Sequence, residues 1–539
     1  MNEDGHIGRR GFLTALSAAA AVVGCRRKPR LEAAFVAPDM ATGHRLRQGG
    51  LPEPEHWEEV PVLIVGGGIA GLSAAWQLDR LGLRDYRVLE LESAAGGTAR
   101  GSRNGISPFP LGAHYLPAPP KAHAALVELL AETGAVESLG PDGEPRYAEH
   151  MLVREPEERI FAGGQWWEGL YFQAGANTED LRQLRAFQAE VDRLAGWRDA
   201  QGRPAFALPR AQGSDAPEIR ALDRLTLADW CNERGLTSPR LRWMLDYGCR
   251  DDYGLHLDET SAWAGLFYFA ARQQGPRDRS RPLLAWPQGN GFLVEHLAAK
   301  AGSRLRTGQA VASLRSVDSG LEARVLDGAT GRMVGYRARR AIFAGPLHVA
   351  GAVVEGLKTE RGPILAAFQR SPWLVVNLTL RTRPKEVGFP MAWDNVLRDS
   401  PSLGYVVATH QRGLDAGPTV WTWYHPFTGD EKAERARLFG MDAAACAEMA
   451  LADLERAHPE VRELVARADV ARWGHAMVRP RPGFCWSEEL VKARQPFGPV
   501  HFAHTEFSGL ALFEEAFDHG LRAAAEVKAA LQRSGSRRT

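Results

Sequence analysis

The chain has 539 residues, with 66 lysines and arginines against 65 aspartates and glutamates, so its formal net charge is +1. A nearly neutral chain offers no basic surface to a phosphate backbone, and we therefore expect no nucleic-acid partner. Its 45% hydrophobic content can bury a large core, which excludes a disordered protein. The five cysteines form no CxxC pair, so they indicate neither a disulfide framework nor a zinc site, and we predict no bound metal.

The first 25 residues have the features of an export signal. Arg9-Arg10 precedes an apolar run over 14–24 that is too short to span a bilayer. The arginine pair resembles a twin-arginine signal, and the residues before Cys25 resemble a lipobox. We therefore expect the twin-arginine machinery to export the folded chain to the periplasmic or cell-surface side, where a lipid at Cys25 would anchor it to the membrane. The alternatives are an accidental arginine pair and ordinary cleavage to a soluble product. Residues 26–58 lack periodicity and are predicted to be a tether.

Residues 60–90 carry the pattern of a strand, a glycine turn, a helix and a second strand. Gly66, Gly68 and Gly71 have the spacing GxGxxG, which permits a tight turn, close approach of a pyrophosphate and close packing of helix on strand. The second strand ends in Glu90, about 20 residues past the turn, where a carboxylate can accept hydrogen bonds from ribose hydroxyls. The combination predicts a dinucleotide site, and the alternative is a purely structural glycine turn.

Gly96 and Gly97 follow Glu90 in the pattern E-x5-GG. This stretch resembles the second-strand signature of the flavin-containing amine oxidase superfamily, and the resemblance implies FAD as the cofactor. Thr98 stands where the family has an arginine. Arg100 is the nearest replacement, so we assign to it the phosphate-binding role that the resemblance implies.

Motifs further along the chain resemble the same family. Gly112 and Ala113 lie in a turn like the one that the family lays beside the flavin ring, and Val311 lies on a strand like the one whose main chain contacts adenine. Glu506 matches the glutamate of FAGTET, which implies a contact with the ribityl-pyrophosphate region. Phe513 begins a segment like MEGAVxSG, and its apolar spacing predicts a long closing helix.

The chain also departs from the family pattern. His504 and Glu515 both stand where the family has glycine, and Glu515 is either turned away from the flavin or tunes it. Many amine oxidases carry a lysine near the stretch 362–369, whereas Lys358 lies several residues too early. The electron acceptor is therefore either oxygen or a quinone or carrier.

These resemblances imply an α/β fold with a Rossmann-like FAD-binding domain built from three chain segments, 59–118, 286–350 and 495–533. A mixed α+β substrate domain, built from 119–285 and 351–494, is interleaved with it. The resemblance extends over most of the chain after residue 59 and is densest near the cofactor.

The substrate pocket has four candidate residues, Trp473, His475, Tyr424 and His114. Trp473 resembles the aromatic cage residue of amine oxidases, but the same stretch resembles protoporphyrinogen oxidase and phytoene desaturase relatives. We expect an exported enzyme that removes hydride from a C–H bond next to an amine nitrogen and passes it to flavin N5. The alternatives are a desaturase, isomerase or porphyrinogen-type oxidase with an apolar substrate, and a non-catalytic flavin-binding partner.

Overall fold

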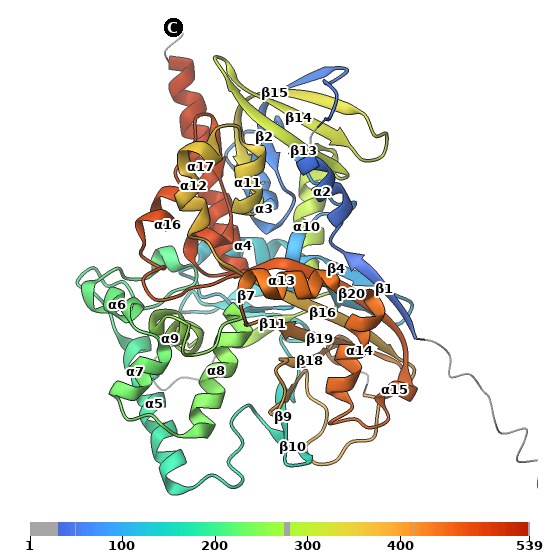
Figure 1. The fold of residues 1–539 in the computed structure, drawn as a ribbon. Coiled ribbons are helices and arrows are strands. Elements are labelled where there is room, and N and C mark those ends of the chain that lie inside the picture. Colours follow the sequence, from blue (N-terminus) through green and yellow to red (C-terminus); the bar gives the residue numbers. More distant parts are fainter. Residues whose placement is uncertain (1–30, 49, 274–280, 414, 537–539) are drawn as a thin grey trace, which may run out of the picture.

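The computed structural model describes residues 31–48, 50–273, 281–413 and 415–536, and Figure 1 shows their fold. The predicted leader with Cys25 lies outside these residues, so export and acylation stay predictions. Among the described helices, none is both long enough and apolar enough to cross a membrane. Two large sheets flanked by helices confirm the predicted α/β class.

One sheet collects strands from three stretches that are far apart in the sequence. In spatial order its strands are β12 (Leu305–Arg306), β3 (Tyr86–Leu89), β2 (Trp57–Val65), β15 (Met333–Phe343), β14 (Gly320–Asp327) and β13 (Gln309–Val317), with β21 (Val500–Phe502) beside the end of β15. β2 pairs in parallel with both β3 and β15, and its last residues are completely enclosed, as its apolar run predicts. Apart from Trp57 and Glu58 at the start of β2, these strands lie in the segments predicted for the nucleotide domain, while the domain boundaries stay predictions.

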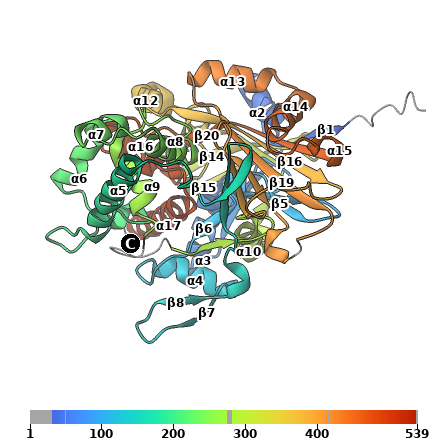
Figure 2. The ribbon, with the colours of Figure 1, turned by 90° about the horizontal axis from the view of Figure 1, so that it is seen from below.

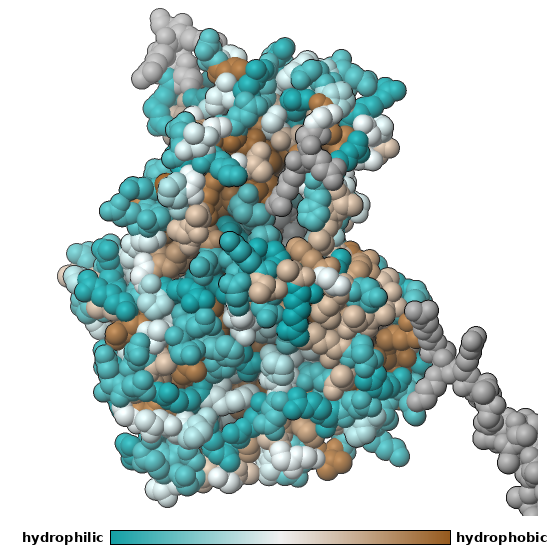
Figure 3. Space-filling view, viewed as in Figure 1, coloured by the Kyte–Doolittle hydropathy of each residue, from teal (hydrophilic) through white to brown (hydrophobic). Residues whose placement is uncertain are grey.

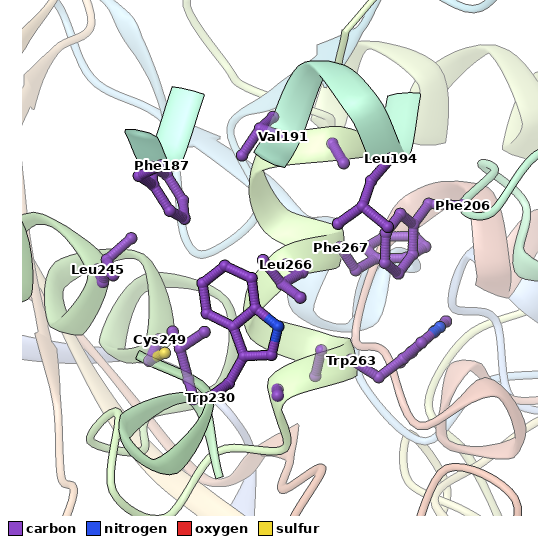
Figure 4. Packing of buried hydrophobic residues seen from close by; sticks show 14 of the residues in the cluster. Phe187, Val191, Leu194, Phe206, Trp230, Leu245, Cys249, Trp263, Leu266 and Phe267 are labelled. Atoms are coloured by element: carbon purple, nitrogen blue, oxygen red, sulfur yellow. The ribbon is translucent and has the colours of Figure 1, made fainter. Parts of the chain in front are cut away.

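A second sheet of eight strands forms the other half of the molecule. Its order is β1 (Glu32–Ala37), β20 (Val465–Val478), β16 (Arg370–Leu380), β19 (Thr419–Pro426), β18 (Gly404–Val407), β17 (Asp394–Leu397), β9 (Glu158–Ala162) and β10 (Gln165–Glu168). A helical group lies to one side of these strands, formed by α5 (Thr178–Gly196), α7 (Leu227–Glu233), α8 (Pro239–Tyr253) and α9 (Ala262–Ala270). Figure 2 shows this separation, and Figure 4 shows the core of the group, where Trp230 and Phe187 pack edge to face.

The remaining elements connect or cover the two sheets. The other helices are α2 (Met40–Gln48), α3 (Ile69–Arg80), α4 (Ala124–Glu132), α6 (Pro217–Ala221), α10 (Gly291–Ala301), α11 (Leu347–Val353), α12 (Leu357–Ala366), α13 (Glu431–Gly440), α14 (Ala443–Leu454), α15 (Val461–Leu464), α16 (Glu488–Ala493) and α17 (Phe513–Ser536). The short strands are β4 (Gly101–Arg103), β5 (Pro108–Pro110), β6 (Tyr115–Pro117), β7 (Val136–Leu139), β8 (Pro145–Tyr147) and β11 (Leu283–Ala285).

The prediction of an unstructured tether over residues 26–58 is wrong for its described part. Residues 32–37 form β1 and residues 40–48 form α2, and β1 pairs in parallel with β20 at the edge of the eight-stranded sheet. The exposure of β1 follows no alternation of buried and exposed positions, because main-chain pairing holds this edge strand. A search for periodic apolar residues therefore finds no signal here.

The closing helix α17 packs against α3 with almost no side chain between them at Gly520. A Cβ added to Gly520 would lie 2.4 Å from the Ala70 carbonyl oxygen and 2.9 Å from the Ser73 Cβ. Figure 1 shows the red α17 beside α3 in the half of the molecule that holds β2 and β15. The long helix predicted after Phe513 is therefore present, and backbone contact fixes its position.

We predict that Gly520→Ala lowers the free energy of unfolding by about 1–3 kcal/mol, because the new methyl group forces α17 away from α3. Urea unfolding followed by circular dichroism measures the change. Gly440→Ala is the matched control, since a Cβ there meets nothing within 4 Å. Equal stability of the two variants would contradict the close contact.

Candidate functional site

The glycine turn between β2 and α3 leaves open space at its middle glycine. A Cβ added at Gly66 would lie 3.1 Å from Ala344, and one at Gly71 would lie 1.9 Å from the Gly66 carbonyl oxygen. In contrast, a Cβ at Gly68 would meet nothing within 4 Å. Gly68 is also the N-cap of the 12-residue α3 and has no side-chain cap. Open space beside uncapped helix N–H groups fits the pyrophosphate of a dinucleotide.

Glu90 lies at the end of β3, against this turn. Its Oε2 accepts a hydrogen bond from the Gly67 N–H at 2.6 Å, and its Oε1 accepts one from the Glu92 N–H at 2.9 Å. Burial raises the pKa of the Glu90 carboxyl group. The Gln309 N–H donates to the Glu90 carbonyl oxygen at 2.7 Å, which brings the strand that contains Val311 alongside. A buried carboxylate at this point fits the predicted ribose contact.

The other predicted flavin loops meet beside the turn. The Gly96 N–H donates to the Gly67 carbonyl oxygen at 2.8 Å, and the Ala113 N–H donates to the Thr98 carbonyl oxygen at 2.9 Å. A Cβ at Gly112 would lie 2.2 Å from the same Thr98 oxygen, so only glycine permits this approach. The fold thus joins three motifs that are separate in the sequence.

Arg100 and Phe513 have less direct relations to the turn. The Arg100 guanidinium donates to Glu92 at 3.5 Å and to the carbonyl oxygens of Ala94 and Val36 at 3.4 and 3.2 Å. These contacts hold the surrounding loop, so the phosphate-binding role of Arg100 stays a prediction. Phe513 is buried in the hydrophobic cluster that also contains the first residue of α3.

Three of the four predicted pocket residues come together at the Gly112 turn. The Tyr424 hydroxyl donates to the Gly112 carbonyl oxygen at 2.9 Å, and the Trp473 indole N–H donates to the Leu111 carbonyl oxygen at 2.7 Å. His114 stacks on Tyr424 with ring centroids 4.7 Å apart. Burial lowers the pKa of His114 to about 4, so the ring is neutral at pH 7. We call these three side chains the aromatic wall.

Sequence analysis missed three carboxylates that lie near the aromatic wall. Glu158 and Asp394 are paired positions on the parallel strands β9 and β17, and Asp251 lies on α8. Burial, followed by the charges of neighbouring carboxylates, raises the pKa of Glu158 to about 7 and that of Asp394 well above its usual range. Burial, followed by the charge of Asp252, raises the pKa of Asp251 to about 7, although the cations of Arg272 and Arg250 act to lower it. Burial, followed by the charges of Asp394 and Asp251, also raises the pKa of Tyr424, so these groups are close to the wall.

The three carboxylates are partly enclosed by the protein. Each residue keeps part of its surface accessible to solvent, although surrounding protein atoms desolvate the carboxyl group strongly. The Tyr268 hydroxyl donates to Asp251 at 3.0 Å. The charges that act most strongly on Glu158 and Asp394 are those of other carboxylates. Figure 3 shows the molecule narrowed at a waist between its two halves, with hydrophobic side chains gathered along it.

His475, the fourth candidate, stacks on His348 instead, with ring centroids 3.8 Å apart. Burial, followed by the charge of His348, lowers the pKa of His475 to about 2, which makes it a neutral ring at any physiological pH. The charges of Arg370 and Glu506 also act on this ring, so the pair lies nearby.

Glu506 forms a buried ion pair with Arg370, in which each side chain is 4% exposed. It also accepts a hydrogen bond from the Leu347 N–H at 3.0 Å. Burial alone would raise the pKa of Glu506, but the charges of Arg370 and His504 outweigh burial and hold the pKa well below its usual range. Glu506, which matches the glutamate of FAGTET, is therefore ionised, and the Arg370 cation balances its charge.

Glu515 is held in a buried hydrogen-bond network. It accepts hydrogen bonds from the Arg210 backbone N–H at 2.6 Å and from the Ser508 hydroxyl. The Arg522 Nε donates to His519 Nδ1 at 3.2 Å, so His519 Nε2 carries the proton and donates to Ser508 Oγ at 2.9 Å. The donors thus run in one direction, from Arg522 to Glu515, and an influence of Glu515 on the flavin stays a prediction.

Comparisons with known proteins agree on one family. The family model described as flavin containing amine oxidoreductase matches residues 69–528. The probable flavin-containing monoamine oxidase A of Dictyostelium discoideum is 24% identical over 506 residues, which cover 87% of this chain and 97% of that protein.

The fold is also similar to several solved structures. A triple mutant of putrescine oxidase has a TM-score of 0.64 at 17% identity, covering 88% of this chain and 100% of that one. Cyclohexylamine oxidase from Brevibacterium oxydans IH-35A has a TM-score of 0.61 at 18% identity, with the same coverage. A CLA-producing fatty acid isomerase from P. acnes has a TM-score of 0.60 at 16% identity, covering 87% and 98%. At these identities the likeness shows the fold alone.

We predict that Arg370→Met lowers the free energy of unfolding by about 3–5 kcal/mol at pH 7, because Glu506 stays buried without its cation. The pair depresses the pKa of Glu506, so its contribution is complete above the unfolded pKa of a glutamate and is lost as pH falls. The deficit of the variant should therefore shrink on acidification in urea unfolding. Arg103→Met, which breaks an exposed pair with Glu295, should cost less than about 1 kcal/mol. Equal losses in both variants would contradict the role of burial.

Proposed function

We infer that the chain, which belongs to the family of flavin-containing amine oxidoreductases, is an enzyme that binds FAD and oxidises an amine. The flavin, when bound, supplies the acceptor for a hydride taken from the C–H bond next to the amine nitrogen. The residues of the chain then have to hold the cofactor, align that C–H bond and stabilise the amine. No side-chain nucleophile is needed, because the imine product hydrolyses afterwards.

The assignment of FAD is supported by the chemistry of the glycine turn. Gly68 offers open space and uncapped N–H groups to a pyrophosphate. Glu90 offers a buried carboxylate to ribose hydroxyls, and Gly96 and Gly112 permit the loops around it to approach closely. Open space, donors and acceptor are thus all present at the positions where the resemblance requires them.

The assignment of an amine substrate is carried by the carboxylates beside the aromatic wall. A substituted ammonium ion is attracted both to the faces of aromatic rings and to carboxylates. Glu158, Asp251 and Asp394 lie close together where burial disfavours their ionised forms, and a cationic substrate would offset that cost. The neutral ring of His114 adds no opposing positive charge.

The three carboxylates also argue against the two alternative functions, an enzyme with an apolar substrate and a non-catalytic flavin-binding protein. A pocket for an apolar substrate gains nothing from ionisable carboxylates, because their desolvation is unfavourable. A flavin-binding protein without a substrate of its own likewise gains nothing from three partly enclosed carboxylates close to the aromatic wall. The structural likeness to a fatty acid isomerase shares the fold and does not oppose the amine assignment.

We predict that purified holoprotein, mixed anaerobically with a panel of mono-, di- and polyamines, loses the visible absorbance of oxidised flavin with at least one amine. Stopped-flow spectroscopy measures the loss and its rate. A panel of unsaturated fatty acids under the same conditions should leave the absorbance unchanged. Absence of bleaching with every amine would contradict the amine assignment, and a protein that takes up no FAD would contradict the cofactor assignment.

We predict that KM for the amine falls as pH rises through about 7, because ionisation of Glu158 and Asp251 creates the negative charge that binds the ammonium group. Glu158→Gln should raise KM about 10-fold or more at pH 8 and weaken this pH dependence, with a smaller effect on kcat. Steady-state kinetics from pH 6 to pH 8 measures KM and kcat, and this pH range includes the expected ionisation near pH 7. Glu168→Gln, on the exposed end of the adjacent strand β10, is the control. An unchanged KM in Glu158→Gln would place the amine elsewhere.

A further inference from the structure

Residues 32–48, which comprise β1 and α2, form a segment that we call the N-terminal strap. The strap precedes the first residue of the family match at residue 69, so family membership assigns it no role. Its contacts nevertheless reach both halves of the molecule, as the blue segment in Figure 1 shows.

One end of the strap is part of the eight-stranded sheet. β1 pairs in parallel with β20, from Glu32 opposite Arg467 to Ala37 opposite Ala471. The Arg472 guanidinium lies over the neighbouring Phe35 ring at 3.7 Å from its centroid. β20 is the strand that also carries Trp473 of the aromatic wall. The strap is therefore joined directly to the strand that shapes the predicted substrate pocket.

The middle of the strap holds the loop that follows Glu90. The Asp39 N–H donates to Glu92 Oε1 at 2.7 Å, and the Val36 carbonyl oxygen accepts from the Arg100 guanidinium at 3.2 Å. Glu92 in turn donates its backbone N–H to the Glu90 carboxylate at 2.9 Å. Two steps of hydrogen bonding thus link the strap to the carboxylate assigned to the ribose.

The far end of the strap packs beside the strand predicted to contact adenine. Leu46 of α2 lies against the small apolar cluster of Ala310, Leu326 and Met333. Ala310 is the residue before Val311 on β13. The helix therefore covers the outer side of the sheet at the position where the adenosine end of FAD is expected.

We propose that the N-terminal strap belongs to the cofactor site: it fixes the Glu90–Arg100 loop and the start of β13, and so slows the release of FAD. The proposal rests on the proposed binding of FAD. The strap and the cofactor then order the same loop. By thermodynamic linkage, the packed strap stabilises bound FAD, and bound FAD stabilises the packed strap. The strap also adds an edge strand beside β20, which carries Trp473. It therefore connects the FAD site to the sheet that shapes the predicted substrate pocket.

The first test measures the effect of the cofactor on the strap. Hydrogen–deuterium exchange of the full chain is compared between the FAD-loaded protein and the same protein after removal of FAD. Peptides from residues 32–48 should exchange at least several-fold more slowly with FAD bound, and peptides from the β7–β8 hairpin should not change. Equal exchange of the strap in both forms would overturn the proposal.

The second test measures the effect of the strap on the cofactor. Leu46→Ala should raise the Kd for FAD and shorten the half-life of the complex by about 3- to 10-fold, measured as recovery of flavin fluorescence after dilution. Leu139→Ala is the control, because Leu139 is 63% exposed on β7. Equal Kd values and half-lives in the two variants would overturn the proposal. Both tests measure FAD binding without an amine. If the strap has no effect but the protein still takes up FAD, only the strap proposal is overturned. If the protein takes up no FAD at all, the proposed function is refuted.

Discussion

The architecture depends on the direct contact of backbone with backbone around α3. At Gly71 the helix rests on the glycine turn itself, and at Gly520 the closing helix α17 rests on α3. Neither contact tolerates a side chain, so the contact at Gly520 holds the last of the three chain segments against the first at a distance that a Cβ would enlarge. The first turns of α17 therefore pack beside the uncapped N-terminus of α3. The chemistry assigned to the turn depends on this geometry, since hydrogen-bond donors act only at short range.

Sequence predicts the parts of this site that local chain geometry determines. At Gly71 and Gly112 the observed neighbours exclude a Cβ, and Gly66 has a φ of +104°, which favours glycine, so their spacing in the sequence reports a real steric requirement. Glu90 is likewise placed by the strand that ends at it. Where the family glycines are replaced, as at Glu515, the sequence leaves two orientations open, and only the partners Arg210 and Ser508 decide between them.

The parts that sequence misses are those assembled across long distances. Glu158, Asp251 and Asp394 come from a strand, a helix and another strand, and each appears in the sequence as an ordinary surface residue. The proximity of Glu158 and Asp394 follows from the register of β9 against β17, and that of Asp251 from the packing of α8, neither of which a local pattern encodes. The N-terminal strap escapes detection for a related reason, because an edge strand held by main-chain pairing needs no apolar period.

The distribution of the first sheet over the whole chain has a consequence for its synthesis. The ribosome completes β2 long before it makes β15, and β21 and α17 emerge only at the end. During that interval β2, which is apolar on both faces, has β3 on one side but lacks β15 on the other, which favours chaperone binding and slow, late folding. The fold around the glycine turn, to which we assign the pyrophosphate, is complete only after the last helix has left the ribosome. We therefore expect cofactor binding to follow translation, since a nascent chain interrupted before residue 500 lacks β21 and α17.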